Sequence, residues 1–151
     1  MIPIQSSKVE VLLAPATVTI ATNASSYGYL DTIGWDQCKI IVLTAKEATT
    51  SACAKLLKIT EGTNSTAASA IVALTGGTAT SASVGFVVPV YKGTAEGGAV
   101  VFDIDLTKRA RYLRIQCNPG TASTFGAIAI LSRGKQEPGS DAGSVQKQVI
   151  A

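Results

Sequence analysis

Hydrophobic and polar residues alternate along most apolar stretches of this chain, and the pattern is clearest across residues 99–119. Apolar residues alternate with acidic ones in 100–106 and with basic or amide residues in 111–117. Successive side chains of a β-strand point to opposite faces, so each segment is predicted to be a strand with one buried and one solvated face. The segment 107–110 is predicted to form the bend between these two strands.

The remaining strands are predicted from shorter apolar stretches that are separated by residues typical of turns. They lie at 8–13, 17–22, 38–45, 55–61, 83–91 and 125–132, with further candidates at 27–32 (an edge strand or an ordered loop) and 71–74 (a strand or a single helical turn). Pro15 is expected to end the first strand, and Gly76 and Gly77 are expected to break the chain. The segment 38–45 is apolar at consecutive positions, which predicts a central strand that is buried on both faces.

About eight or nine strands and no convincing amphipathic helix are typical of an all-β protein, and we predict a β-sandwich. Eight strands in two sheets would form a jelly roll, which we favour among the sandwiches although the pattern does not give the strand order. The sandwich is expected to cover residues 1–132, including a short N-terminal arm. Residues 133–151 are polar, contain glycine and proline, and are expected to form an extended C-terminal arm.

Two interpretations of the C-terminal segment remain open. In the first it is a disordered tail, as is usual for chain termini. In the second it becomes ordered on a neighbouring subunit, where Val145, Val149 and Ile150 would add a strand to that subunit's sheet. Under the second interpretation Lys135 also belongs to the contact.

The composition is unusually apolar and poor in charge for a free monomer. Hydrophobic residues make up 46% of the chain and charged residues only 15%. This fits a β protein with long loops of small residues, and also one whose surface is partly covered by partners. The net charge of +3 is too mild and too dispersed to indicate nucleic acid binding.

The densest basic group is formed by Lys108, Arg109, Arg111 and Arg114. It is either a solvated corner or an ion-pairing contact to a partner subunit. Because Arg111 and Arg114 differ by an odd number, strand alternation places them on opposite faces.

Residues able to carry chemistry are few. The chain has no histidine, which excludes Ser-His-Asp and Cys-His catalysis and most zinc sites. Asp103 and Asp105 share a face and could form a calcium ligand set or a glycosidase-like pair, but their simplest role is a solvated face. Cys38, Cys53 and Cys117 lack metal-binding spacing, and Cys38 and Cys117 are expected to pack as small apolar residues of a chain made in a reducing compartment.

We therefore expect no catalytic residue, no cofactor and no metal. No signal peptide pattern and no stretch of transmembrane length is present in the sequence, so no membrane partner is expected either.

Three sequence features carry a resemblance to a known family. An aromatic and glycine-containing segment at 27–36 leads into the strand at 39–43, a basic segment at 105–115 contains Arg-Tyr-Leu-Arg, and an Ala/Ile strand at 127–131 runs into a proline-containing tail. Over residues 27–138 the chain resembles the small jelly-roll cement or decoration proteins of tailed bacteriophage heads.

That resemblance implies a non-enzymatic virion protein, made in the host cytoplasm and bound to the capsid exterior. It would stabilise joints between copies of the major capsid protein, often as a homodimer or homotrimer. The N-terminal arm, the basic segment 108–114 and the tail from Lys135 onward are the candidate contacts.

A second class of function stays open: a carbohydrate- or receptor-binding β-sandwich module. Such a module would use Trp35, Tyr27 and Tyr29 as a stacking platform, with Asp31 and Asp36 nearby. It requires these rings to be exposed, whereas a tryptophan in a sandwich commonly belongs to the core.

Overall fold

The computed structural model describes residues 7–18, 26–44, 56–64, 71–78, 98–118 and 123–133. These residues form eight strands and no helix, which confirms the predicted all-β class. The strands are β1 (Ser7–Val18), β2 (Ser26–Asp31), β3 (Gln37–Thr44), β4 (Leu56–Gly62), β5 (Ile71–Thr78), β6 (Gly98–Asp105), β7 (Tyr112–Asn118) and β8 (Ser123–Ser132). The predicted strand at 83–91 lies outside the described residues.

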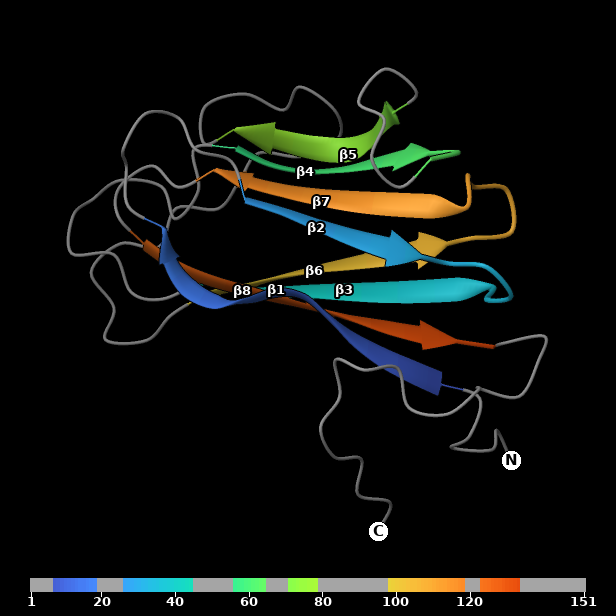
Figure 1. The fold of residues 1–151 in the computed structure, drawn as a ribbon, viewed down its shortest axis with the longest axis horizontal. Coiled ribbons are helices and arrows are strands. Elements are labelled where there is room, and N and C mark those ends of the chain that lie inside the picture. Colours follow the sequence, from blue (N-terminus) through green and yellow to red (C-terminus); the bar gives the residue numbers. More distant parts are fainter. Residues whose placement is uncertain are drawn as a thin grey trace, which may run out of the picture.

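The strands form two four-stranded sheets, stacked as layers with their strands along the long axis of the molecule (Figure 1). One sheet has the order β1-β8-β3-β6, the other has the order β2-β7-β4-β5, and neighbouring strands are antiparallel. Every connection except that between β4 and β5 passes from one sheet to the other. This is the strand order of a jelly roll, so the predicted β-sandwich and its jelly-roll topology are confirmed.

The hydrophobic core lies between the sheets and is built from alternate residues of the strands. The first sheet contributes Cys38, Ile40, Val42, Phe102, Ile104, Phe125, Ala127, Ala129 and Leu131, and the second contributes Leu30, Leu57, Ile59, Leu113, Ile115 and Cys117, with Leu106 from the β6–β7 turn. Burying each large apolar side chain contributes roughly 1.5–3 kcal/mol to folding. The alternation predicted for 100–106 is confirmed, whereas the one predicted for 111–117 holds only over 112–115, because Arg111 precedes β7 and is exposed and Gln116 is buried.

Cys38 and Cys117 are buried in this core, as predicted. Burial raises the pKa of Cys38 to about 12, and the nearby charge of Glu10 adds to the shift. The Cys38 thiol therefore stays protonated at neutral pH and packs as a small apolar side chain. Cys53 lies outside the described residues.

Two expected breaks in the chain are wrong. Pro15 does not end a strand, because β1 continues to Val18 through register shifts between Val11 and Leu13 and between Leu13 and Ala16. Gly76 and Gly77 do not break the chain either, because both pair with β4 inside β5. β1 and β5 are edge strands, where a missing N–H, a bulge or a glycine costs little.

The prediction that 38–45 is buried on both faces is also wrong. β3 is central in its sheet, but its burial alternates, and Leu43 is 54% exposed. The outer face of β3 is apolar without being buried. That face belongs to a surface described below.

The edges of the two sheets come together where β1 passes β2. A Cβ atom placed on Gly28 would lie 2.5 Å from the carbonyl oxygen of Leu12, so the two backbones meet with no room for a side chain. Glycine is therefore required here by close approach of the backbones. The contact closes one side of the sandwich.

We expect Gly28→Ala to destabilise the protein by about 1–3 kcal/mol, because the new methyl group overlaps the β1 backbone and one strand must shift. Gly126→Ala is the matched control, since its Cβ would lie 3.3 Å from Pro15 Cγ and 3.7 Å from the Leu13 carbonyl oxygen, so a shift of a few tenths of an ångström is enough to make room for it. Urea unfolding of both variants measures the difference. A Gly28→Ala variant as stable as wild type would contradict the close approach of β1 and β2.

Candidate interaction surfaces

The basic segment predicted as a bend lies at one end of the sandwich, which we call the turn end. Here residues 32–36 join β2 to β3 and residues 106–111 join β6 to β7. The two turns are hydrogen-bonded to each other, since the Leu106 N–H donates to the Asp36 carbonyl oxygen at 2.9 Å. The Thr32 N–H and hydroxyl both donate to the Arg111 carbonyl oxygen, at 2.9 Å and 2.6 Å.

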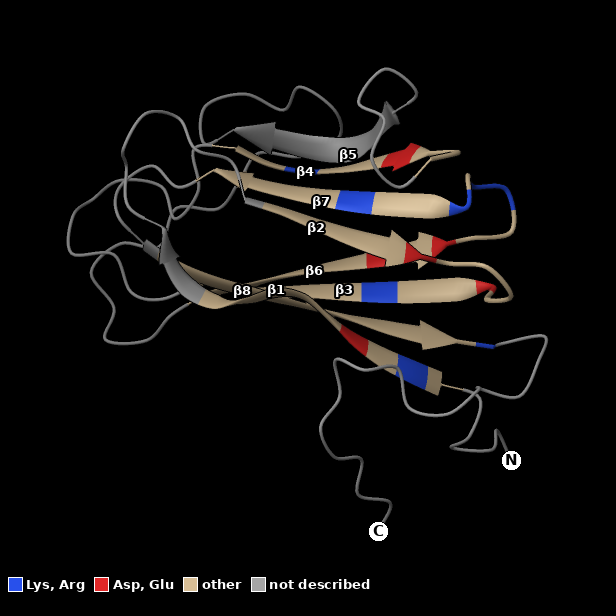
Figure 2. Cartoon of the chain, in the orientation of Figure 1, with Lys and Arg blue, Asp and Glu red and all other residues tan. Residues whose placement is uncertain are grey.

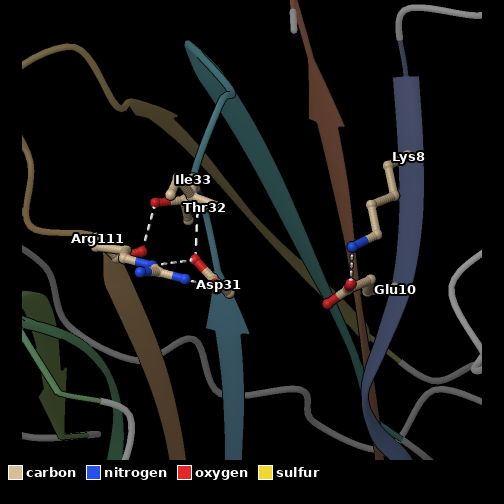
Figure 3. A network of polar contacts seen from close by, with 6 residues as sticks. All are labelled: Lys8, Glu10, Asp31, Thr32, Ile33 and Arg111. Carbon is tan, nitrogen blue, oxygen red and sulfur yellow. Dashed lines mark hydrogen bonds and ion pairs between the residues drawn. The ribbon is translucent and has the colours of Figure 1, made fainter. Parts of the chain in front are cut away.

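A bidentate ion pair at the turn end joins β2 to the start of β7 (Figure 3). Arg111 Nε donates to Asp31 Oδ1 at 2.9 Å, and its Nη2 donates to Oδ2 at 2.7 Å. Asp31 Oδ1 also accepts the Ile33 N–H. The hydrogen bonds from Arg111 hold the pKa of Asp31 below its usual value, and the same pair raises the pKa of Arg111. Figure 3 also shows a separate Lys8–Glu10 pair on β1.

Two further carboxylates fix the β6–β7 turn. Glu61 accepts the Ala110 N–H at 3.0 Å and pairs with the Arg109 guanidinium at 3.5 Å. Asp105 accepts the Thr107 N–H and hydroxyl at 3.0 Å and 2.7 Å, and these bonds lower the pKa of Asp105. The chain's own carboxylates therefore bind two of the arginines of the basic segment.

The candidate partner-binding residues lie in different parts of the molecule. Lys108 and Arg109 are exposed at the turn end, and their role as partner contacts stays a prediction. The placement of Arg111 and Arg114 on opposite faces is wrong, because Arg111 precedes β7 and its guanidinium lies over the ring of Tyr112, on the same side as Arg114. The other candidates, Lys135, Val145, Val149 and Ile150, lie outside the described residues.

The outer face of the β2-β7-β4-β5 sheet carries aromatic and cationic side chains. In one row across the strands Tyr27 pairs with Gln116 and Gln116 pairs with Lys58; in the next row Tyr29 pairs with Arg114 and Arg114 pairs with Thr60. We call this surface the Tyr–Arg face, and its members are Tyr27, Tyr29, Lys58, Thr60, Arg114 and Gln116. Tyr27 is 44% exposed and Tyr29 is 43% exposed.

Contacts within the Tyr–Arg face hold its side chains in place. The Arg114 guanidinium lies over the Tyr27 ring, 5.0 Å from its centroid, and Arg114 Nε donates to Thr60 Oγ1 at 3.3 Å. The Gln116 amide donates to the Tyr27 hydroxyl at 3.5 Å. Thr60 and Gln116 are themselves buried, so the exposed groups rest on an ordered polar layer.

The outer face of the β1-β8-β3-β6 sheet is apolar instead. One row of paired residues crosses all four strands through Val11, Ile128, Ile41 and Val101. Together with the adjacent rows it forms the apolar face, whose members are Val9, Val11, Ile41, Leu43, Val101, Ile128 and Ile130. Val101 is 50% exposed and Leu43 is 54% exposed. The consecutive apolar residues of β3 thus supply the core with one set of side chains and this face with the other.

Charge is distributed unevenly over the described residues. In Figure 2 most of the charged residues lie toward the turn end of the strands. On the same sheet face Lys39 and Asp103 form an ion pair at 3.2 Å, in the row that also holds Val9 and Ile130. A shallow depression beside this pair is lined by Gln37, Cys38, Lys39, Asp103, Ile104, Asp105 and Ser132.

The two acids singled out in the sequence lie on the solvated face of β6, as their simplest role predicts. Asp103 forms an ion pair with Lys39, and Asp105 accepts a hydrogen bond from the Thr107 hydroxyl. The two acids therefore do not form a pair with each other. Among the described residues no group of three His, Cys, Asp or Glu could hold a metal ion. In the same part of the chain no helix is long and apolar enough to cross a membrane.

Trp35 does not join the tyrosines. It lies between β2 and β3 at the turn end, partly buried and packed against the core. Of the three aromatic residues of the predicted stacking platform, Tyr27 and Tyr29 are exposed on β2, and Trp35 lies apart from them. Sequence reasoning missed Lys58, Thr60 and Gln116, for which only the strand alternation gave a signal.

Comparison with known proteins finds a distant structural likeness. No protein-family model matches the chain, and no curated protein sequence matches it. Among solved structures, the chain is similar to the K3 cleaved adhesin domain of Lys-gingipain from Porphyromonas gingivalis W83, with 15% identity and a TM-score of 0.48. The match covers 81% of this chain and 74% of that one. A likeness this distant carries no information about what the chain binds.

We expect Asp31→Asn to lower the free energy of unfolding at pH 7 by about 1 kcal/mol or less, because solvent screens a pair this exposed. Since folding lowers the pKa of Asp31, its contribution is present above the unfolded pKa of about 3.9 and is lost as pH falls through the folded value. Urea unfolding at pH 7 and pH 2.5 should show the variant and wild type converging at low pH. Asp103→Asn, in a more exposed pair, is the control; a pH-independent deficit in Asp31→Asn would contradict the ion-pair explanation.

Proposed function

We propose that the chain is a non-enzymatic virion structural protein that binds the outside of a capsid and stabilises it as a cement or decoration protein. The partner would be the major capsid protein, contacted by many copies of this chain, alone or as a dimer or trimer. The observation that carries the proposal is the apolar face. It would dock on the shell, leaving the outer face of the other sheet exposed.

The apolar face supports a docking role because its chemistry does not suit permanent contact with water. Contiguous exposed apolar surface on a soluble protein commonly marks an interaction site. The row through Val11, Ile128, Ile41 and Val101 crosses the whole sheet without a charge, and the next row, which holds Val9 and Ile130, also carries the Lys39–Asp103 pair. An uncharged centre with a polar margin is the usual arrangement of a protein–protein interface.

The proposed partner is supported by the sequence and by the logic of repeated attachment. The segments that carry the resemblance to phage decoration proteins over residues 27–138 lie mainly on β2, β3, β7 and β8. A shell presents many identical sites, so a modest interface on each copy is sufficient when copies are linked. The basic residues Lys108 and Arg109 and the two termini would supply additional contacts in this arrangement.

The test adds purified chain to particles assembled from the encoding virus genome with this gene deleted. Bound copies are counted after sedimentation. We expect Leu43→Glu to reduce binding at least about tenfold, because docking would bury an unpaired carboxylate. Gln37→Glu is the matched control, since it adds the same charge on the same face of the same strand at its polar end. Particles that take up no wild-type chain, or that take up Leu43→Glu as well as wild type, would refute the proposal.

A second candidate, the carbohydrate- or receptor-binding module, is favoured by a separate observation. Such a module requires exposed rings, and Tyr27 and Tyr29 stand exposed side by side on one strand face. Trp35 would not take part. This candidate uses the Tyr–Arg face and leaves the apolar face free, so both functions are compatible in one molecule.

A further inference from the structure

We propose that the Tyr–Arg face binds an acidic saccharide, with Arg114 and Lys58 facing its carboxylate or sulfate groups and the tyrosine rings packing on its sugar rings. This inference rests on the second candidate function and names its ligand class. It is independent of docking through the apolar face.

The geometry supplies two adjacent aromatic rings. Tyr27 and Tyr29 are two residues apart on β2, so they project from the same face at a spacing of about 7 Å. Aromatic rings offer apolar area at small entropic cost while their hydroxyls hydrogen-bond, which suits a ligand with both C–H faces and hydroxyl groups.

The charge of the Tyr–Arg face selects an anion. Its two cations, Arg114 and Lys58, are on neighbouring strands, and in the described residues neither forms an ion pair with a carboxylate. No member of the face is acidic. The nearest acid, Asp31, is already bound to Arg111 through both oxygens. Two uncompensated cations beside exposed rings favour a ligand that carries negative charge.

Arg114 is positioned before a ligand arrives. Its guanidinium is held by the Tyr27 ring and by Thr60 Oγ1, which fixes the direction of its remaining N–H groups. A planar guanidinium can bind a carboxylate through two parallel hydrogen bonds. Because its rotamer is already ordered, less entropy is lost when a ligand binds.

An acidic saccharide fits this surface better than nucleic acid does. Nucleic acid binding needs a row of cations along the phosphate backbone, and this face offers two. The chain's net charge of +3 provides little further attraction. A saccharide with one acidic group for every one or two rings matches two rings and two cations.

The experiment titrates the full-length chain by calorimetry with trigalacturonate and 3′-sialyllactose. The neutral counterparts are fully methyl-esterified trigalacturonate, which keeps the same rings, and lactose; single-stranded dT10 is a third probe. We expect binding of at least one acidic saccharide, at least tenfold tighter than its neutral counterpart and weakened by added salt. Arg114→Gln should lower that affinity at least tenfold, and Tyr29→Ala should do the same. Lys39→Gln, which removes a cation from the opposite sheet, should leave it unchanged.

The outcomes distinguish the acidic ligand proposed here from the carbohydrate-binding function on which it rests. Equal binding of acidic and neutral saccharides would overturn the acidic ligand and leave the carbohydrate-binding candidate standing. No saccharide binding would overturn both, and binding of dT10 alone would assign the face to nucleic acid. Acid-selective binding that Arg114→Gln and Tyr29→Ala leave unchanged would place the site elsewhere, provided that urea unfolding shows both variants to be folded.

Discussion

The apolar inner face of each four-stranded sheet can leave water only by packing against the other sheet, and the whole molecule depends on this contact. Ile40 and Ile59, on internal strands of opposite sheets, are completely buried in it. No helix of the described chain could cover either inner face in its place. The position of every other side chain, inward or outward, follows from this packing through the two-residue period of the strands.

Closing the sandwich restricts its edges. Where β1 meets β2, the backbones are so close that only Gly28 fits, and β1 accommodates the bend through two register shifts around Leu13. At the turn end the closure is polar: carboxylates on β2, β4 and β6 accept N–H groups from the adjacent turns. Backbone N–H groups that leave the sheets there find partners in these side chains, and for the partly buried Ala110 N–H such a partner is required.

The two outer faces differ in chemistry although the same alternation produces both. One presents branched aliphatic residues such as Val101 and Leu43, and the other presents Tyr27, Tyr29 and Arg114 over buried polar groups. The contrast between the two outer faces does not affect the core, because outward-facing residues contribute little to it. The sheet scaffold therefore leaves each face free to serve a separate partner, one apolar and one anionic in the proposals made above.

The sequence alone determined the all-β class, the inward and outward residues of β6 and of 112–115 in β7, the burial of Cys38 and Cys117 and the solvated role of Asp103. These are local properties, since a strand's period depends only on its neighbours along the chain. Only the tertiary structure decided that Pro15 lies within an edge strand, that Leu43 is exposed, and which side chains meet across strands. Arg111 and Asp31 are 80 residues apart in sequence, and the Tyr–Arg face is assembled from three strands. Such contacts depend on strand order, which is set by packing of the two sheets and which no local pattern encodes.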